Sequence, residues 1–130
     1  MPSVLIVDDE KDARDVLTRY LRRSGFAVRG AANGQDALAA IGTSLPDVVL
    51  LDWMMPQMDG IGFLEVIRSY LRWKRLPVVL ITAYHGEHID RAKELGVKRI
   101  FFKPDYQLDH LLECIKTLLS DPNTDCASVG

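Results

Sequence analysis

Cysteines, long apolar runs and excess positive charge are all scarce in this chain of 130 residues. The two cysteines, Cys114 and Cys126, have no spacing typical of a metal site or of a disulfide framework, so we expect a reduced, cytoplasmic chain. No apolar run approaches the roughly 20 residues that span a membrane. Because a strand-like segment begins almost at Met1, we expect no signal peptide.

The charge balance argues against direct binding to nucleic acid. The 16 Lys and Arg residues are outnumbered by 18 Asp and Glu residues, and the net charge of -2 offers no basic surface. The length suits one domain with one core. We place this domain at residues 1–120 and expect the remainder, 121–130, to be a flexible C-terminal tail, because it lacks periodicity.

Apolar residues alternate between strand-like and helix-like patterns along the chain. Short strand-like runs occur at 4–7, 48–51, 78–81 and 99–102, and all but the last are continuous, as in strands covered on both faces. A less continuous run at 26–29 is expected at the edge of the sheet. Stripes at three- and four-residue spacing predict helices within 13–21, 37–41, 64–71, 89–95 and 108–119. Three of these stripes end at a glycine, a common helix stop: Gly25, Gly42 and Gly96.

These five repeats of strand and helix predict an α/β fold, a doubly wound five-stranded parallel sheet. Right-handed crossovers and an edge position for the second strand favour the flavodoxin-like (βα)5 arrangement with strand order 2-1-3-4-5. In that order the chain reverses between the first and third strands. The ligand crevice is therefore expected at the C-terminal ends of those two strands.

Polar side chains stand where the apolar strands stop. They are three carboxylates, a hydroxyl and an ammonium: Asp8, Asp9, Asp52, Thr82 and Lys103. Because the C-terminal ends of parallel strands share one edge, these side chains are expected to converge. The carboxylates would repel one another unless a hard cation such as Mg2+ neutralised them. Asp52 is then either a metal ligand only or also a nucleophile toward phosphorus, with Thr82 and Lys103 stabilising the transferred charge.

Each of these residues has a simpler explanation when it is considered alone. Asp8 or Asp9 alone would often cap the following helix. Thr82 alone would complete a turn, and Lys103 alone would be a solvated strand end. Five such coincidences at one edge favour a joint phosphate site.

The four segments that carry these residues resemble the receiver domain of response regulators, the phosphoacceptor module of two-component signalling. They are Val-Asp-Asp-Glu at 7–10, Leu-Asp-Trp-Met-Met-Pro-Gln-Met-Asp-Gly at 51–60, Ile-Thr-Ala at 81–83 and Lys-Pro at 103–104. Each segment is weak evidence alone, whereas all four in this order are specific. The resemblance covers roughly residues 3–119. It implies a signalling module rather than an enzyme, with intrinsic Mg2+-dependent self-phosphorylation and autodephosphorylation.

The resemblance also implies a role for each acidic residue. Asp52 matches the aspartate that accepts the phosphoryl group from a histidine kinase or a histidine phosphotransfer protein. Asp8, Asp9 and Asp52, together with the backbone carbonyl of Met54, match the groups that hold Mg2+.

The remaining residues match a switch that responds to the phosphoryl group. Thr82, Ala83 and Lys103 are implied to bind it, and Pro104 to shape the adjacent loop. Phosphorylation would then alter the face made by the fourth helix, the fifth strand and the fifth helix. A downstream target or output domain would recognise that face. We expect no nucleic acid or membrane binding by this domain, and a monomer or weak dimer.

The switch side of the site departs from the family pattern at the fifth strand. Ile100 stands three residues before Lys103, where similar domains often carry an aromatic ring that swings inward. Phe101 cannot replace that ring, because adjacent residues of a strand point to opposite faces. Tyr84 is a candidate substitute for the ring in the loop after Thr82.

A second departure follows Pro104. Asp105 is an extra residue there, which either weakens the ion pair of Lys103 or caps the next helix, and Tyr106 takes the apolar position. Met54 and Tyr84 flank the expected phosphoryl position and are neither acid, amide nor base. This predicts a phosphoryl lifetime of at least minutes.

Two other functions fit the sequence less well. A phosphatase of the haloacid-dehalogenase type also uses an aspartate and Mg2+, but its Asp-x-Asp motif follows the first strand, where this chain has Asp8-Asp9-Glu10. A flavin-binding module would need a Ser/Thr/Gly-rich phosphate loop after the first strand, and a nucleotide-binding P-loop is also missing. The basic run at 72–75 is interpreted as a solvated face.

Overall fold

A computed structural model describes residues 1–52, 60–83, 88–103 and 105–120. Strands and helices alternate along the whole of this part of the chain. In order they are β1 (Ser3–Val7), α1 (Lys11–Arg23), β2 (Ala27–Ala31), α2 (Gly34–Thr43), β3 (Val48–Asp52), α3 (Gly60–Ser69), β4 (Val78–Thr82), α4 (His88–Glu94), β5 (Arg99–Phe102) and α5 (Leu108–Ser120).

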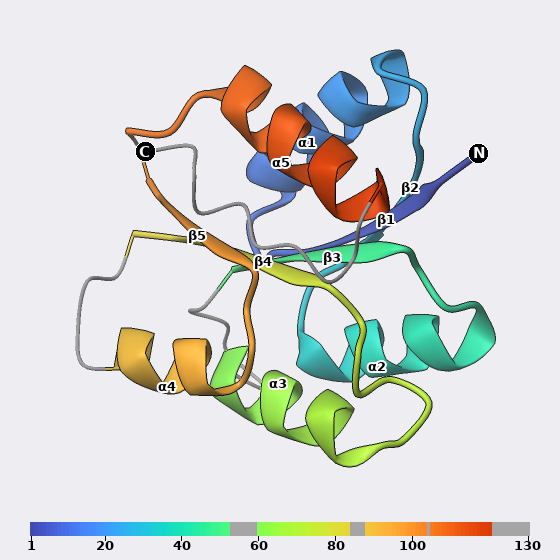
Figure 1. Cartoon of the computed structure of the whole chain (residues 1–130). Helices are drawn as coiled ribbons and strands as arrows, with labels where there is room; N and C mark the ends of the chain where they lie inside the picture. The colour runs from blue at the N-terminus through green and yellow to red at the C-terminus, as the bar shows by residue number, and fades with distance from the viewer. Residues whose placement is uncertain (53–59, 84–87, 104, 121–130) are drawn as a thin grey trace.

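The five strands form one parallel sheet in the order β2-β1-β3-β4-β5. This confirms the predicted fold, including the edge position of the second strand. Helices α1 and α5 cover one face of the sheet, and α2, α3 and α4 cover the other (Figure 1). The chain reverses between β1 and β3, so the C-terminal ends of these two strands flank the expected crevice.

Two hydrophobic clusters, one on each face of the sheet, hold the helices in place. Neighbouring residues of one strand contribute to different clusters: Leu5 packs with α2 and α3, and Ile6 packs with α1 and α5. Both side chains are at most 1% exposed. This explains the continuous apolar runs, because a strand covered on both faces must be apolar on both. Each fully buried side chain of this size contributes about 1.5–3 kcal/mol.

Two helix ends agree with the sequence, and two differ. Gly25 and Gly96 follow α1 and α4 with φ of 97° and 80°, as the glycine stops predicted. Helix α2 instead continues through Gly42 to Thr43, and α3 ends at Ser69 before the predicted Leu71. Residues 70–75 form turns, in which the Trp73 backbone N–H donates to the Tyr70 carbonyl at 3.1 Å.

The assignment of Leu71 to the apolar stripe of the third helix is therefore wrong. Leu71 is 88% exposed, whereas Trp73 packs against the cluster on the α2–α3–α4 face. Its ring also lies 4.8 Å from the ring of Tyr70, centroid to centroid. The indole of Trp73, and not the side chain of Leu71, therefore packs against this hydrophobic cluster.

The C-terminal part of the chain bears on two further expectations. Cys114, which is buried in α5, is disulfide-bonded. The expectation of reduced cysteines is wrong for this residue, because cysteine count and spacing do not determine which thiols meet in space. The predicted tail at 121–130 lies outside the described residues. Within the described ranges, every helix is too short or too polar to cross a bilayer.

Candidate phosphoacceptor site

The predicted polar residues lie at one edge of the sheet, where four strands end. Asp8 and Asp9 follow β1, Asp52 is the last residue of β3, Thr82 is the last residue of β4, and Lys103 follows β5. Lys103 contacts both Asp8 and Asp52, so these strand ends meet across the reversal between β1 and β3. The structure thus brings together the side chains of Asp8, Asp9, Asp52 and Lys103, and Thr82 is joined to Lys103 through its backbone.

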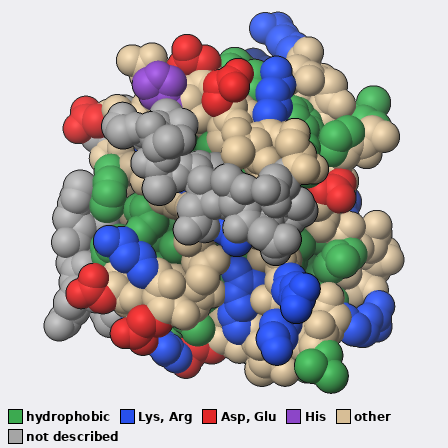
Figure 2. Space-filling view, viewed as in Figure 1, with side chains coloured by type: hydrophobic (Ala, Val, Ile, Leu, Met, Phe, Trp, Pro, Cys, Tyr) green, Lys and Arg blue, Asp and Glu red, His purple; other side chains and the backbone are tan. Residues whose placement is uncertain are grey.

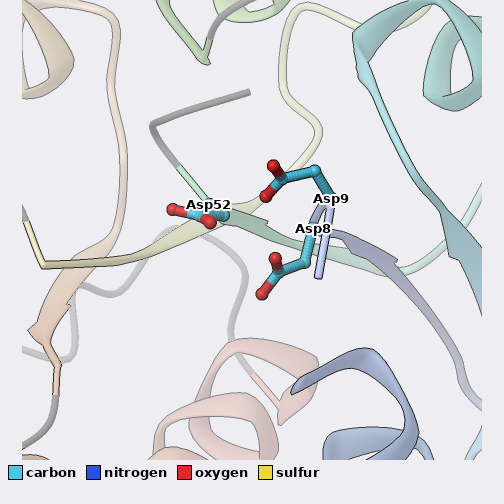
Figure 3. A group of neighbouring side chains, drawn as sticks. All are labelled: Asp8, Asp9 and Asp52. Atoms are coloured by element: carbon cyan, nitrogen blue, oxygen red, sulfur yellow. The ribbon is translucent and has the colours of Figure 1, made fainter. Parts of the chain in front are cut away.

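The three carboxylates form an acidic cluster at this edge (Figure 3). One oxygen from each of Asp8, Asp9 and Asp52 lies within 4.8 Å of the other two. Asp8 is 3% exposed and Asp52 is 9% exposed, whereas Asp9 is exposed to solvent. Opposite ligands of a Mg2+ ion stand about 4.2 Å apart, so small side-chain rotations would bring these oxygens to an ion. The cluster therefore fits a hard divalent cation.

Lys103 is the cation that balances the acidic cluster. Its Nζ lies 3.3 Å from Asp8 Oδ2 and 3.7 Å from Asp52 Oδ2. Burial alone lowers the pKa of Lys103, but the charges of Asp52 and Asp8 outweigh it and hold the pKa above its usual value. One ammonium cannot neutralise three carboxylates, so the site retains a net negative charge that a divalent cation would compensate.

The loop between β1 and α1 is held by hydrogen bonds centred on Asp8. Its Oδ1 accepts from the Glu10 backbone N–H at 2.9 Å, and its N–H donates to the Ala31 carbonyl at 3.0 Å. The N-cap of α1 is Glu10, without a side-chain cap bond. The alternative in which Asp8 or Asp9 occupies the N-cap position of this helix is therefore wrong.

Arg14 is a member of the site that the sequence analysis missed. Its Nη1 donates to the backbone carbonyl of Asp8 at 2.6 Å, which ties α1 to the loop that carries both aspartates. The signal available in the sequence was its position in the first turns of the helix that follows Asp9. The spacing alone does not say that the side chain turns back toward the loop.

Thr82 and Ala83 lie between the acidic cluster and β5. Thr82 is fully buried, and its backbone carbonyl accepts from the Lys103 N–H at 2.8 Å. Ala83 is exposed directly after it. The ends of β4 and β5 are thus linked through the backbone of Thr82 and Lys103, two of the three residues implied to bind the phosphoryl group.

The fifth strand has the predicted orientation. Ile100 packs against the cluster on the α2–α3–α4 face, and Phe101 packs against the cluster on the opposite face. The Phe101 ring lies 5.7 Å from the ring of Tyr106, which is half-buried, and burial raises the pKa of Tyr106. Phe101 therefore cannot occupy the space of an aromatic residue at position 100, and Tyr106 fills the expected apolar position.

Asp105 lies in a turn that follows β5. Its backbone N–H donates to the Phe102 carbonyl at 3.0 Å, and α5 begins three residues later, at Leu108. The interpretation of Asp105 as the cap of this helix is wrong, because the residue lies too far before its first turn. Three other predicted positions, Met54, Tyr84 and Pro104, lie outside the described residues, and their roles stay predictions.

The chain matches a protein family over most of its length. The model of the response regulator receiver domain matches residues 4–116. Sporulation initiation phosphotransferase F of Bacillus subtilis is 37% identical over 118 residues, which cover 89% of this chain and 92% of that protein. The transcriptional regulatory protein GltR of Pseudomonas aeruginosa is also 37% identical, over 90% of this chain and 48% of that protein. The chain thus spans about half the length of some relatives and nearly all of others.

Solved structures agree with this match. The response regulator TrrA of Thermotoga maritima, in complex with Mg2+ and BeF, aligns with a TM-score of 0.80 and 30% identity over 91% of this chain and 99% of that one. The chemotaxis protein CheY4 of Vibrio cholerae aligns with a TM-score of 0.82 and 29% identity over 90% of this chain and 98% of that one.

Proposed function

Because the chain belongs to the response regulator receiver domain family, we propose that it is a phosphorylation switch of a two-component system. The phosphoryl group would come from a histidine kinase or a histidine phosphotransfer protein. Its acceptor would be Asp52. The family match supports this function over the phosphatase and flavin-binding alternatives.

The arrangement of Asp52 and Lys103 supports the transfer step. An oxygen of Asp52 attacks the phosphorus of a phosphohistidine, the phosphorus–nitrogen bond breaks, and the imidazole leaves with the electron pair and takes up a proton. Lys103, 3.7 Å from Asp52 Oδ2, lies where its ammonium can pair with an oxygen of the transferred group. Negative charge spreads over the phosphoryl oxygens in the transition state, and this ammonium would stabilise that charge.

We assign metal binding to Asp8, Asp9 and Asp52, with the Met54 carbonyl as a further ligand. Bound there, Mg2+ supplies positive charge that allows a dianionic phosphoryl group to approach the carboxylates. The hydrogen bonds of Asp8 to Glu10 and to Arg14 support this assignment, because they restrict the loop before any ion arrives.

The signal would leave the site through Thr82 and Lys103. Their backbone hydrogen bond couples the ends of β4 and β5, so a displacement of Thr82 toward the phosphoryl group would be transmitted to β5. Ile100 cannot supply the movement of an aromatic ring. The response of the α4–β5–α5 face would therefore depend on Tyr84 taking the role of that ring.

The observation that carries the proposal is the acidic cluster paired with Lys103 in a chain of this family. It is tested by labelling the protein with radioactive acetyl phosphate, with and without Mg2+. We expect labelling that requires Mg2+ and is lost in Asp52→Asn. Asp109→Asn, which changes an exposed aspartate of α5, serves as the matched control and should label normally. Equal labelling of the wild type and Asp52→Asn would contradict the assignment of the acceptor.

A further inference from the structure

A groove lined by cationic side chains lies at the opposite end of the strands from the acidic cluster. It is bounded by the segments that precede β4 and β5 and has a volume of about 680 Å³. Its cationic lining residues are Arg68, Lys74, Arg75 and Lys98. Figure 2 shows Lys and Arg side chains gathered over this region, in the lower middle of the view. We call it the basic groove.

Arg68 forms the inner wall of the basic groove and is more than half buried. It donates from Nε to the Leu95 carbonyl at 2.7 Å and from Nη1 to the Leu76 carbonyl at 2.8 Å. Its Nη2 makes only one long contact in the described part of the chain, 3.5 Å to the Gly96 carbonyl. Burial lowers the pKa of Arg68. The guanidinium thus joins two loops through neutral carbonyls and retains donor capacity toward the groove.

Glu94, the carboxylate beside the basic groove, pairs with a residue outside it and neutralises neither Lys74 nor Arg75. Glu94 is the acidic residue among those that line the groove. Its Oε2 lies 3.1 Å from Nη1 of Arg91, and Arg91 also pairs with Glu65 of α3. Among the described residues, neither Lys74 nor Arg75 pairs with a carboxylate. The groove therefore carries an excess of positive charge, although the whole chain is slightly acidic.

We propose that the basic groove binds a small organic phosphate, with Lys74 and Arg75 contacting its phosphate oxygens and Arg68 forming the inner wall. Guanidinium and ammonium groups are the usual partners of phosphate, and the volume is that of a small-molecule site. Arg75 and Leu76 also line a smaller groove of about 280 Å³ with Pro46, Pro77 and Leu119, which would take the apolar portion of such a ligand. The net charge of -2 argues against a nucleic acid polymer as the occupant.

The test uses the full-length chain, labelled with ¹⁵N, without Mg2+ and without a phosphodonor. Pyrophosphate and ADP are titrated while amide chemical shifts are followed. We expect saturable shifts at Leu76, Gly96 and Lys98 that persist in Asp52→Asn. That variant separates this proposal from the phosphoacceptor function, since it removes the acceptor and leaves the basic groove intact. Shifts confined to the acidic cluster, or no saturable shift, would overturn the proposal.

A pair of variants distinguishes a specific site from general attraction of anions. Lys74→Ala combined with Arg75→Ala removes two exposed cations of the groove and should weaken binding at least about tenfold. Arg23→Ala combined with Lys116→Ala removes two exposed cations that line neither of the two grooves and should leave the affinity within about twofold. Equal loss in both variants would mean non-specific attraction and would refute the site. ADP binding more tightly than pyrophosphate would support a role for the smaller apolar groove.

Discussion

Replacement of Lys103 by methionine tests the electrostatic balance of the acidic site. The substitution keeps most of the apolar stem and removes the ammonium that faces Asp8 at 3.3 Å and Asp52 at 3.7 Å. At an effective dielectric constant of about 20, each contact amounts to about 5 kcal/mol of attraction. The Lys103 side chain is 24% exposed, so solvent screening and the desolvation of the charges reduce the net loss to about 2–3 kcal/mol.

The predicted loss is measurable by urea denaturation without Mg2+. With a slope of about 2 kcal/mol per molar urea, the midpoint of Lys103→Met should fall by about 1–1.5 M relative to the wild type. Lys116→Met, at an exposed position of α5, is the matched control and should not shift the midpoint. Addition of Mg2+ should stabilise Lys103→Met more than the wild type, because a bound cation relieves a larger excess of negative charge in the variant.

The direction of the pH dependence follows from the raised pKa of Lys103. A raised pKa means that the folded state holds the proton more tightly than the unfolded state, so the contribution is fully present at neutral pH. It is lost as the pH rises above the usual value of 10.5 and through the folded-state pKa. The difference between wild type and Lys103→Met should therefore shrink at such alkaline pH. Equal midpoints at neutral pH, or equal stabilisation of both proteins by Mg2+, would refute the reasoning.

Three further outcomes are expected. Arg14→Ala removes the hydrogen bond to the Asp8 carbonyl and should weaken Mg2+ binding several-fold, as measured by calorimetry. Arg19→Ala changes an exposed arginine of the same helix and should leave the Mg2+ affinity unchanged. Equal affinities of the two variants would contradict a positioning role for Arg14. Leu64→Ala should lower the free energy of unfolding by about 2–5 kcal/mol, whereas Leu71→Ala should change it little, since Leu64 is fully buried and Leu71 is 88% exposed. The phosphoryl group on Asp52 should persist for at least minutes after removal of the donor in a pulse-chase with Mg2+; loss within seconds would show that a water-activating group had been overlooked.

The sequence predicted the fold well because its strands are covered on both faces. A strand with helices on each side must be apolar throughout, and that requirement is visible as the runs around Leu5 and Leu50. Helix ends were predicted less reliably. The spacing of Leu71 fits a helix, but Leu71 is exposed and the indole of Trp73 packs against the core. A periodic pattern does not show which of two nearby apolar residues packs against the core.

The positions of the acidic residues could also be predicted, because strand ends in a parallel sheet share one edge. The Arg14–Asp8 contact could not, since a long side chain on a helix has many rotamers, and the neighbouring loop selects one. The cap assigned to Asp105 was wrong for a related reason: the length of the turn before Leu108 depends on how α5 docks on the sheet.

The sequence by itself determined the order of strands and helices and the residue types at the carboxyl edge of the sheet, because apolar periodicity and chain connectivity are local or topological properties. Only the tertiary structure decided that Lys103 lies between Asp8 and Asp52, and that Arg68 comes together with Lys74 and Arg75 in one groove. These arrangements join segments distant in the chain. Their geometry depends on packing distances of a few ångströms that no pattern along the sequence contains.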